Sequence, residues 1–520
     1  MRGGQERRGQ RLPDWLRWRS DVSPDALALK AGTLEWSYRE LQEKVSVLSA
    51  VLLSRGVERG SRVALLMPPS ERSIALVHAI ARVGAVAVPL NLRQSTPELL
   101  SQLRDSSPSL VIHDDAFGAK FDELEGRNAA RRWDRASELM AESASGGGEP
   151  VLGDRLDASS PHAIIYTSGS SGAPKGVELT LSNLMWNAIS IGWRTGTSSK
   201  DRWLLCMPLF HVGGYTIIFR SVLHGSGIVL HPRFEPKLVS LSLDNDGVTL
   251  ASFVPTMLTD VLEARSGRPL DPRVRLIFLG GGQPPAQLVA AIRKRRLPVL
   301  LTYGMTETCS QVALSNVLES STGPSYQALL PSDVAVTKPG KGDRVELAGP
   351  GEVGVVAVRG PTLFKGYWRR PALTRAQFKG EWFLTGDLGV FQPGGSKRGR
   401  TAGGIVILGR REETIVTGGE KVVPAEVEAA LREHPSVKDA VVVGVDDPKW
   451  GQRVVAVVET KGPSGVRPLA SELSAFLRGR VGRYKVPKEY RFWDALPRTS
   501  TGKTRRAEVR LLVERGEDPS

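Results

Sequence analysis

The sequence predicts an α/β protein in which a large N-terminal domain precedes a small C-terminal α+β domain. Two observations lead to this prediction. In the first part of the chain, short apolar runs alternate with helical patterns, which is typical of a parallel sheet covered by helices. After residue 345, β-rich segments separated by glycine turns take over. We therefore expect doubly wound α/β subdomains and a β-rich subdomain within residues 1–409, and the small domain within residues 410–520.

Four apolar runs of the first part are expected to be buried strands, because each ends in polar residues or in a Gly/Pro turn. They are residues 61–70, 84–91, 109–115 and 162–169. Between them, "SIALVHAIARVG" and "TPELLSQLRDSS" carry apolar residues at helical spacing, with Ser73 or Thr96 as candidate N-caps. Ligands of such folds bind beyond the carboxyl ends of the strands, so we expect the site there.

The rest of the chain divides into a linker and a second, β-rich part. Residues 141–161 are rich in Gly, Ser and Pro without a periodic pattern, which indicates a linker of low order. "GEVGVVAVRG", "GIVILGR" and "VKDAVVVGV" are expected strands. "VVPAEVEAALREHP" is an expected helix with Pro424 near its first turn, where proline is tolerated. A small α+β unit from about residue 410 to the end fits these patterns.

The composition is that of an ordinary globular chain, since 41% of its 520 residues are hydrophobic and can form sizeable cores. We expect a cytoplasmic protein, because no apolar stretch is long enough to cross a bilayer and no secretory signal is recognisable. Cys206 and Cys309 are the only cysteines, too few for a disulfide framework or a thiolate metal site. The formal charge of +15 is compatible with nucleic acid, a membrane surface or anionic substrates. The arginines are spread along the chain without a nucleic-acid motif, so we expect an arginine-rich surface and no nucleic-acid partner.

The stretch "YTSGSSGAPKGVELT", residues 166–180, combines glycines with hydroxyl side chains and one lysine directly after an apolar run. A glycine-rich turn at the end of a strand exposes backbone N–H groups, which form a nest for phosphate oxygens. The spacing differs from that of the G-x-x-x-x-G-K-[ST] loop. Taken alone, the stretch indicates either a phosphate-binding loop or a flexible Gly/Ser loop.

Six stretches follow one another between residues 166 and 503: "YTSGSSGAPKG", "PLFHVGG", "YGMTET", "WFLTGDLG", "GRREETIVTGGEKVVPAEVE" and "PRTSTGK". Together they resemble the core motifs of the acyl-adenylating superfamily, which includes acyl-CoA synthetases, adenylation domains and luciferases. The resemblance implies the adenylate-forming fold with a mobile C-terminal domain. It also implies ATP, Mg²⁺ and coenzyme A: an acid attacks the α-phosphate of ATP, and a thiol then displaces AMP. The glycine-rich stretch is thereby identified as the loop for the triphosphate.

The resemblance assigns ATP-binding roles to several motif residues. The loop over the β- and γ-phosphates comprises Thr167, Ser168, Gly169, Ser170, Ser171, Gly172 and Lys175. The residues that frame adenine and the acyl group are Gly280, Gly281, Gly282, Tyr303 and Gly304. Asp387 accepts hydrogen bonds from the ribose, with Arg410 nearby. Thr306 contacts the α-phosphate and Glu307 holds Mg²⁺, since a carboxylate beside phosphates needs a bridging cation.

The resemblance also divides the reaction between two arrangements of the domains. Lys503 reaches the α-phosphate and the attacking carboxylate oxygen in the first step. The small domain then rotates about a hinge at Glu412, where Asp or Lys is more common, and Gly418 and Gly419 come to face the thiol tunnel. The basic turn at residues 391–404 is longer than usual in the family. It is either a solvated hairpin tip or a contact for a partner or for coenzyme A.

His211 and Arg220 are the candidate residues for the acid. Three stretches, "IFLGGGQPP", "YGMTETCSQV" and "PLFHVGGYTIIFR", are together most similar to the o-succinylbenzoate-CoA ligases of menaquinone biosynthesis. In these enzymes an arginine nine positions after the histidine serves the second carboxylate of the substrate. A buried arginine in the apolar stretch "YTIIFRSVL" needs an anionic partner, either this carboxylate or one of the protein. The alternatives are another acyl- or aryl-CoA ligase, an enzyme that loads a carrier protein, and a nonenzymatic basic scaffold. The sequence specifies no oligomeric state.

Overall fold

The computed structural model describes most of the chain. The described residues are 11–126, 130, 132–144, 155–167, 174–282, 284–316, 324–338, 345–393, 403–417, 420–448, 450–461, 467–478, 480–499, 502 and 504–518. The predicted phosphate loop from Ser168 to Gly172 lies outside them, as do most residues of the basic turn at 391–404. Among the described residues, no helix has both the length and the apolar character needed to cross a membrane.

A seven-stranded sheet forms the first layer and contains the four predicted strands. In spatial order its strands are β20 (Gly366–Tyr367), β10 (Lys175–Thr180), β9 (Pro161–Thr167), β5 (Val86–Pro89), β4 (Arg62–Leu66), β6 (Leu110–His113) and β7 (Trp133–Arg135). The strands from β9 to β7 are parallel, whereas β10 returns antiparallel to β9. The predicted phosphate loop therefore connects two antiparallel neighbours.

The two helices predicted in this region are present, but their caps differ from the prediction. α3 (Glu71–Arg82) begins after Ser70, whose hydroxyl accepts from the Ser73 amide at 3.1 Å. Ser73 is thus the third helical residue, and its hydroxyl donates back to the Ser70 carbonyl. α4 (Thr96–Ser106) begins after Ser95, whose amide donates to Glu98 at 2.8 Å. Ser73 and Thr96 were therefore wrong as N-caps, because each lies within the first turn that the true cap opens.

A nine-stranded sheet forms the second layer. In spatial order its strands are β17 (Gln327–Ala328), β16 (Ser310–Asn316), β15 (Val299–Met305), β14 (Leu276–Leu279), β13 (Leu250–Phe253), β11 (Arg202–Leu205), β12 (Gly227–Leu230), β2 (Leu27–Ala31) and β3 (Leu34–Ser37). The strands from β15 to β2 are parallel, and β16 and β3 pair antiparallel at the two sides. The carboxyl ends of β11, β13, β14 and β15 consequently lie along one edge.

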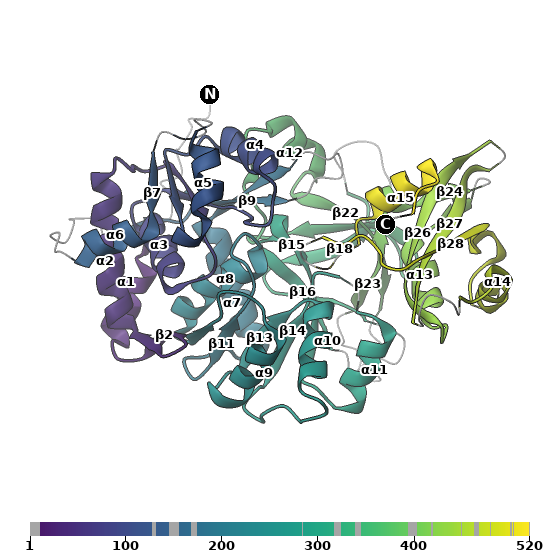
Figure 1. The fold of residues 1–520 in the computed structure, drawn as a ribbon, viewed down its shortest axis with the longest axis horizontal. Coiled ribbons are helices and arrows are strands. Elements are labelled where there is room, and N and C mark those ends of the chain that lie inside the picture. Colours follow the sequence, from purple (N-terminus) through teal and green to yellow (C-terminus); the bar gives the residue numbers. More distant parts are fainter. Residues whose placement is uncertain are drawn as a thin grey trace.

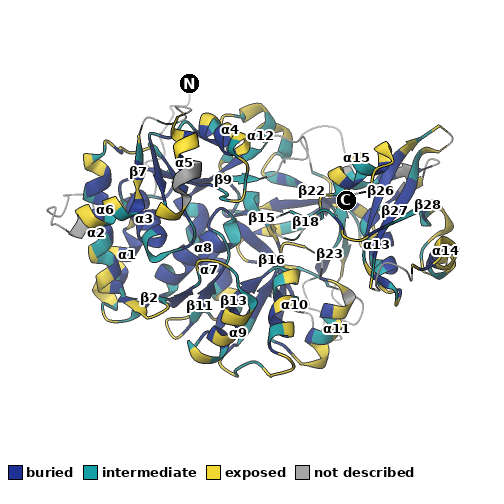
Figure 2. Ribbon diagram, viewed as in Figure 1, coloured by how far each residue is buried: buried dark blue, intermediate teal, exposed yellow. Residues whose placement is uncertain are grey.

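Helices α7 (Leu181–Thr195) and α8 (Val212–His224) lie between these two sheets (Figure 1). One apolar core joins Ile165 of the first sheet, Leu184 and Ile217 of the helices, and Phe278 of the second sheet. A second core lies under the helices on the other face of the nine-stranded sheet, which are α9 (Pro236–Asn245), α10 (Pro255–Ala264) and α11 (Ala286–Lys294). The outer faces of the helices are exposed and the strands are buried, as expected for covered parallel sheets (Figure 2).

The β-rich part of the prediction is confirmed as two further sheets. An antiparallel sheet contains β18 (Asp333–Thr337), β19 (Val353–Arg359), β21 (Phe378–Lys379), β22 (Trp382–Gln392) and β23 (Gly404–Arg410). The last sheet contains β24 (Ile415–Thr417), β25 (Glu420–Val422), β26 (Val437–Asp447), β27 (Gly451–Thr460) and β28 (Glu489–Trp493). Around it lie α13 (Pro424–Arg432), α14 (Ala470–Arg478) and α15 (Arg506–Arg515), and Pro424 opens α13 as predicted.

The C-terminal sheet and its helices form a unit with its own apolar cores, whose members all lie between Ile415 and Val513. In Figure 1 this unit lies at one end of the molecule. The chain enters it after β23, through the short 3₁₀ turn Arg411–Glu413. The α/β fold class with a small α+β unit is therefore confirmed.

The predicted linker at residues 141–161 is wrong at both of its ends. α6 (Ala136–Ala144) continues into it, and β8 (Arg155–Asp157) pairs antiparallel with β1 (Arg11–Pro13). Residues 145–154 lie outside the described part. β8 exists because the start of the chain supplies its partner, which local composition cannot indicate. The other helices of the large part are α1 (Trp15–Val22), α2 (Tyr38–Ser54), α5 (Gly118–Glu125) and α12 (Pro371–Gln377).

Candidate active site

Tyr303, Asp387 and Arg410, which belong to three separate motifs, meet in one hydrogen-bonded cluster. The Tyr303 hydroxyl donates to Asp387 Oδ2 at 2.7 Å. The Arg410 Nε lies 3.0 Å from Asp387 Oδ1, because β22 and β23 place these two residues opposite each other. Arg410 also donates to the Thr385 carbonyl at 3.0 Å. Three residues that the sequence assigned to ATP binding thus lie in contact with one another.

The electrostatics of this cluster hold each member in its hydrogen-bonding form. Burial, followed by the charge of Asp387, raises the pKa of Tyr303 well above its ordinary value, so the hydroxyl remains a donor. Burial lowers the pKa of Arg410, but Asp387, Tyr303, Glu307 and Glu413 together outweigh burial and leave it raised. Arg410 therefore stays charged between the third sheet and the turn that leads to the C-terminal unit.

The predicted glycines lie at the carboxyl ends of β14 and β15. A Cβ on Gly280 would come within 2.1 Å of Thr302 Oγ1, and one on Gly304 would come within 2.0 Å of the Ser310 carbonyl oxygen. Gly281 has a φ of +83°, which side chains rarely adopt. A Cβ on Gly282 would meet nothing within 4 Å. Close packing within the protein therefore requires glycine at 280 and 304, whereas Gly282 leaves open space at this edge.

Glu307 lies on the 3₁₀ turn Thr306–Thr308, directly after β15. Its carboxylate accepts the Tyr367 hydroxyl at 2.9 Å, and its main-chain oxygen accepts the Phe364 amide at 2.9 Å. Among the described residues, no Lys or Arg forms an ion pair with Glu307, and no group of three metal-ligating side chains occurs. One carboxylate with an oxygen left for a cation fits Mg²⁺, which usually takes few protein ligands and completes its shell with phosphates and water.

The two ends of the predicted phosphate loop lie beside Glu307. Thr167 ends β9 and Lys175 begins β10, and the two residues are paired across the strands. The Lys175 Nζ lies 5.7 Å from the ring centre of Tyr367, the residue that donates to Glu307. A cation from the loop and a carboxylate from the 3₁₀ turn thus flank one tyrosine, as a site for a magnesium triphosphate requires.

Gly502 is the described residue of the C-terminal unit that approaches this edge from the "STGK" motif. A Cβ on Gly502 would lie 2.9 Å from Thr256 Oγ1, in the first turn of α10. Val254, just before that helix, is the residue that a Cβ on Gly281 would meet at 3.0 Å. Lys503, Gly418 and Gly419 lie outside the described residues. Glu412 lies in the 3₁₀ turn between the two parts of the chain, as expected for a hinge.

His211 and Arg220 both belong to α8, one at its start and the other deep inside the protein. His211 occupies the N-cap position, with its ring centre 4.5 Å from that of Phe210. Arg220 is completely buried. Its Nε and Nη2 donate to Asn187 Oδ1 at 2.9 and 2.7 Å, and Nη2 also donates to Gln311 Oε1. Among the described residues, no carboxylate pairs with Arg220, and its Nη1 has no hydrogen-bond partner.

Sequence reasoning missed four residues of this region. Thr385 lies two positions before Asp387 in the same motif, so a signal for it existed. The sequence contained no signal for Tyr367, because Glu307, which it contacts, lies 60 positions away in the chain. Asn187 and Gln311 are 33 and 91 residues from Arg220. Asn187 belongs to no recognised motif, whereas Gln311 lies in the stretch "YGMTETCSQV" without a role assigned to it. Only the packing of α7, α8 and β16 shows that these amides surround the arginine.

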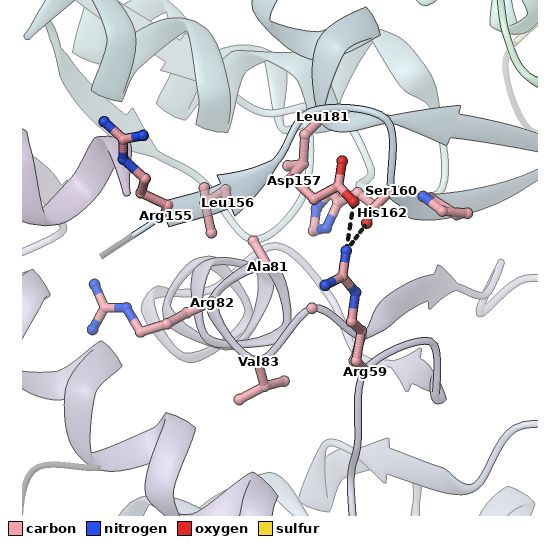
Figure 3. A pocket seen from close by; sticks show the side chains of 13 residues that line it. Arg59, Ala81, Arg82, Val83, Arg155, Leu156, Asp157, Ser160, His162 and Leu181 are labelled. Carbon is pink, nitrogen blue, oxygen red and sulfur yellow. Dashed lines mark hydrogen bonds and ion pairs between the residues drawn. The ribbon is translucent and has the colours of Figure 1, made fainter. Parts of the chain in front are cut away.

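The cavity drawn in Figure 3 is a different place, since no residue predicted for the site lines it. It lies beside His162, at the amino end of β9, about 17 Å along the strand from Thr167. Arg59 extends into this region and bonds Asp157 at 2.5 Å and Ser160 at 3.0 Å (Figure 3). Ligands of parallel α/β sheets bind at the opposite, carboxyl end of the strands, so this cavity is not the candidate site.

Comparisons with known proteins cover both parts of the chain. Residues 16–368 match the AMP-binding enzyme family, and residues 426–503 match the AMP-binding enzyme C-terminal domain. A 2-succinylbenzoate–CoA ligase of Geobacillus kaustophilus is 35% identical over 508 residues, 97% of this chain and 99% of the relative. The o-succinylbenzoate CoA synthetase of Bacillus subtilis with its acyl-adenylate intermediate has a TM-score of 0.86 and 32% identity, covering 96% of this chain and 98% of that one. The same enzyme with ATP and magnesium has a TM-score of 0.86 and 31% identity, covering 96% and 99%.

Proposed function

The chain belongs to the AMP-binding enzyme family, as its six motifs predicted, and on that premise we propose that it is an ATP-dependent acid–CoA ligase for o-succinylbenzoate. The observation that carries the choice of acid is the buried Arg220, which no carboxylate of the described residues neutralises. An unpaired buried cation is costly for a protein to keep. A second carboxylate on the substrate gives that cation a partner.

The first step joins the acid to AMP. A carboxylate oxygen of the acid bonds to the α-phosphorus of ATP, and the bond to the β-phosphate breaks, so an acyl-adenylate forms and pyrophosphate leaves. Lys175 and the loop from Thr167 to Gly172 hold the β- and γ-phosphates, and Thr306 contacts the α-phosphate. Glu307 holds Mg²⁺, which neutralises charge on the phosphates. Catalysis of this kind is mainly positioning and electrostatics.

The nucleoside and the attacking oxygen are held by residues from both parts of the chain. Asp387 accepts from the ribose, Arg410 orients that carboxylate, and the edge from Gly280 to Gly282 faces adenine opposite Tyr303. Lys503 reaches in from the C-terminal unit to the carboxylate oxygen as the bond to phosphorus forms. The approach of Gly502 to Thr256 supports this role, because Gly502 belongs to the same motif as Lys503.

The second step transfers the acyl group to coenzyme A. The thiol sulfur bonds to the acyl carbon, AMP leaves with the electron pair of the broken C–O bond, and the thiol proton is lost. Lys503 obstructs the thiol, so the C-terminal unit rotates about Glu412 and brings Gly418 and Gly419 to the tunnel. We therefore propose that residues 1–409 and 410–520 are the two domains that move relative to each other. The supply of ATP and coenzyme A in the cytoplasm supports a cytoplasmic location.

The acid is held along α8. His211, at the start of the helix, lines the acyl pocket near the reacting carboxylate, and Arg220 receives the second carboxylate at the far end of the acid. Arg220 comes nine positions after His211, a rise of about 13.5 Å along the axis. Arginine side chains on a helix lean toward its amino end, which shortens this separation to one that an aromatic diacid can span.

The proposal is tested by pyrophosphate release across a panel of acids, with coenzyme A or a carrier protein as acceptor. We expect o-succinylbenzoate to be turned over best and only coenzyme A to yield a thioester. A preference for another acid would contradict the proposed substrate but would still support an acid–CoA ligase. Acyl transfer only to a carrier protein would contradict coenzyme A as the acceptor. The absence of pyrophosphate release with every acid would reject an adenylating enzyme and favour the basic scaffold.

A further inference from the structure

We propose that Asn187 and Gln311 are positioning residues that determine specificity: their neutral amide oxygens hold Arg220 and leave its charge for the second carboxylate of the acid. This inference rests on the proposed function and deepens it. The sequence suggested two partners for Arg220, a substrate carboxylate or a protein carboxylate. The structure shows a third arrangement, in which the protein supplies hydrogen-bond acceptors that carry no charge.

The orientation of both amides is fixed by their other hydrogen bonds. Gln311 Oε1 accepts from Arg220 Nη2 and, at 2.6 Å, from the Ser310 hydroxyl. Asn187 Oδ1 accepts twice from Arg220, while its Nδ2 lies 3.5 Å from the Gln311 carbonyl oxygen that accepts from it. All four side chains are buried. The amide oxygens therefore face the guanidinium, and this network leaves them no freedom to turn away.

The network lies next to the edge that carries the candidate site. Gln311 is the strand partner of Gly304, between Tyr303 and the 3₁₀ turn that carries Glu307. The guanidinium that Gln311 holds is thus at the level of Gly304. Its Nη1 is buried and, among the described residues, has no hydrogen-bond acceptor. A donor left unsatisfied in this position costs free energy unless a ligand accepts from it.

Neutral partners preserve the positive charge of Arg220, which a carboxylate partner would neutralise. An amide oxygen satisfies N–H donors, but it does not cancel the positive charge. Burial lowers the pKa of Arg220 to about 10, so the guanidinium remains charged at neutral pH even without a carboxylate beside it. The Trp203 ring, 5.5 Å from Arg220 Cζ, adds a contact that also leaves the charge in place.

The test converts one neutral partner into a charged one of the same shape, with the full-length enzyme. Gln311→Glu should give Arg220 an internal carboxylate. We expect kcat/KM for o-succinylbenzoate to fall about tenfold or more, mainly through KM, because the substrate carboxylate then competes with the introduced carboxylate for the guanidinium. With 4-oxo-4-phenylbutanoate, which is o-succinylbenzoate without the ring carboxylate, the same variant should lose much less. Pyrophosphate release with both acids measures the ratio.

Gln42→Glu is the matched control. Gln42 Oε1 accepts from Arg82, whose side chain is largely buried and already pairs with Asp14 at 2.6 Å. Gln42 lies on α2, which packs against α1, α3 and α6. The control therefore places the same new carboxylate beside an arginine elsewhere in the fold. It should leave the ratio of the two acids unchanged, so a drop in Gln311→Glu alone cannot come from a general effect of a carboxylate added beside an arginine.

Two outcomes overturn the inference. Equal losses with both acids, which leave their ratio unchanged, would make Gln311 a structural residue. Full activity of Gln311→Glu with both acids, in an enzyme that prefers the diacid, would show that the charge of Arg220 is not what the amides preserve. If Gln311→Glu does not fold, Asn187→Asp makes the same test at the other amide partner of Arg220. An unchanged ratio of the two acids in that variant would also contradict the inference. A wild-type enzyme that is indifferent to the ring carboxylate would instead refute the proposed substrate.

Discussion

Two arginines are almost completely inaccessible to solvent, and the regions around them treat the buried charge in opposite ways. Arg265, directly after α10, lies 2.8 Å from Asp244 and donates to the main-chain oxygens of Ser240 and Pro269. Arg220, within α8, is held by two amides and has one nitrogen without a partner among the described residues. The first region neutralises its cation within the fold. The second keeps a cation unneutralised, which indicates that a ligand completes it.

Under the proposed mechanism, substitution of Lys503 has the largest effect expected for a cation that contacts the substrates. Lys503→Ala should reduce acyl-adenylate formation by about 10²- to 10³-fold, because a charge at the developing transition state is lost. Thioester formation from supplied acyl-adenylate and coenzyme A should remain largely intact, since the proposed mechanism uses the lysine only in the first step. Rapid-quench measurement of each half-reaction separates the two. Equal losses in both half-reactions would contradict this division.

Arg265→Leu should show what the loss of a structural cation looks like. Asp244 and the main-chain oxygens of Ser240, Arg268 and Pro269 lose a donor, so we expect the free energy of unfolding to fall by about 3 kcal/mol. This is the lower end of the range for a broken buried pair, because Arg268 still contacts Asp244 at 3.0 Å. Urea unfolding measures the change. The folded enzyme should keep its ratio of activities between diacid and monoacid.

A changed acid preference in Arg265→Leu would contradict the comparison, because it would mean that the region of Arg265 also affects the substrate. An unchanged free energy of unfolding would contradict it as well, since the pair with Asp244 would then contribute nothing to the stability of the fold. The same urea titration on Arg220→Leu supplies the reference, as that variant removes a cation that no carboxylate of the described residues holds.

The sequence was sufficient to predict the strands and the motif residues, for different physical reasons. β4, β5, β6 and β9 are buried on both faces, so each reads as a continuous apolar run. Tyr303, Asp387 and Arg410 were predicted from their motifs, and the pairing of β22 with β23 brings the last two together.

The features that the sequence could not predict depend on contacts between distant segments. β8 is a strand because β1 lies beside it. Asn187 and Gln311 hold Arg220 because α7, α8 and β16 pack together. The apolar stretch around Arg220 indicated a buried arginine, but the choice between a charged and a neutral partner is made by residues that no local pattern joins to it.

Arg220→Leu tests the central claim most directly, with steady-state pyrophosphate release from o-succinylbenzoate and from 4-oxo-4-phenylbutanoate. Removing a charge-assisted contact of roughly 1.5 to 3 kcal/mol should lower kcat/KM for o-succinylbenzoate about 10- to 150-fold. Turnover of the monoacid should hold steady or improve, because it offers the arginine no partner. If both activities fall by the same factor, Arg220 is a structural residue like Arg265, and the assignment of the diacid loses its support.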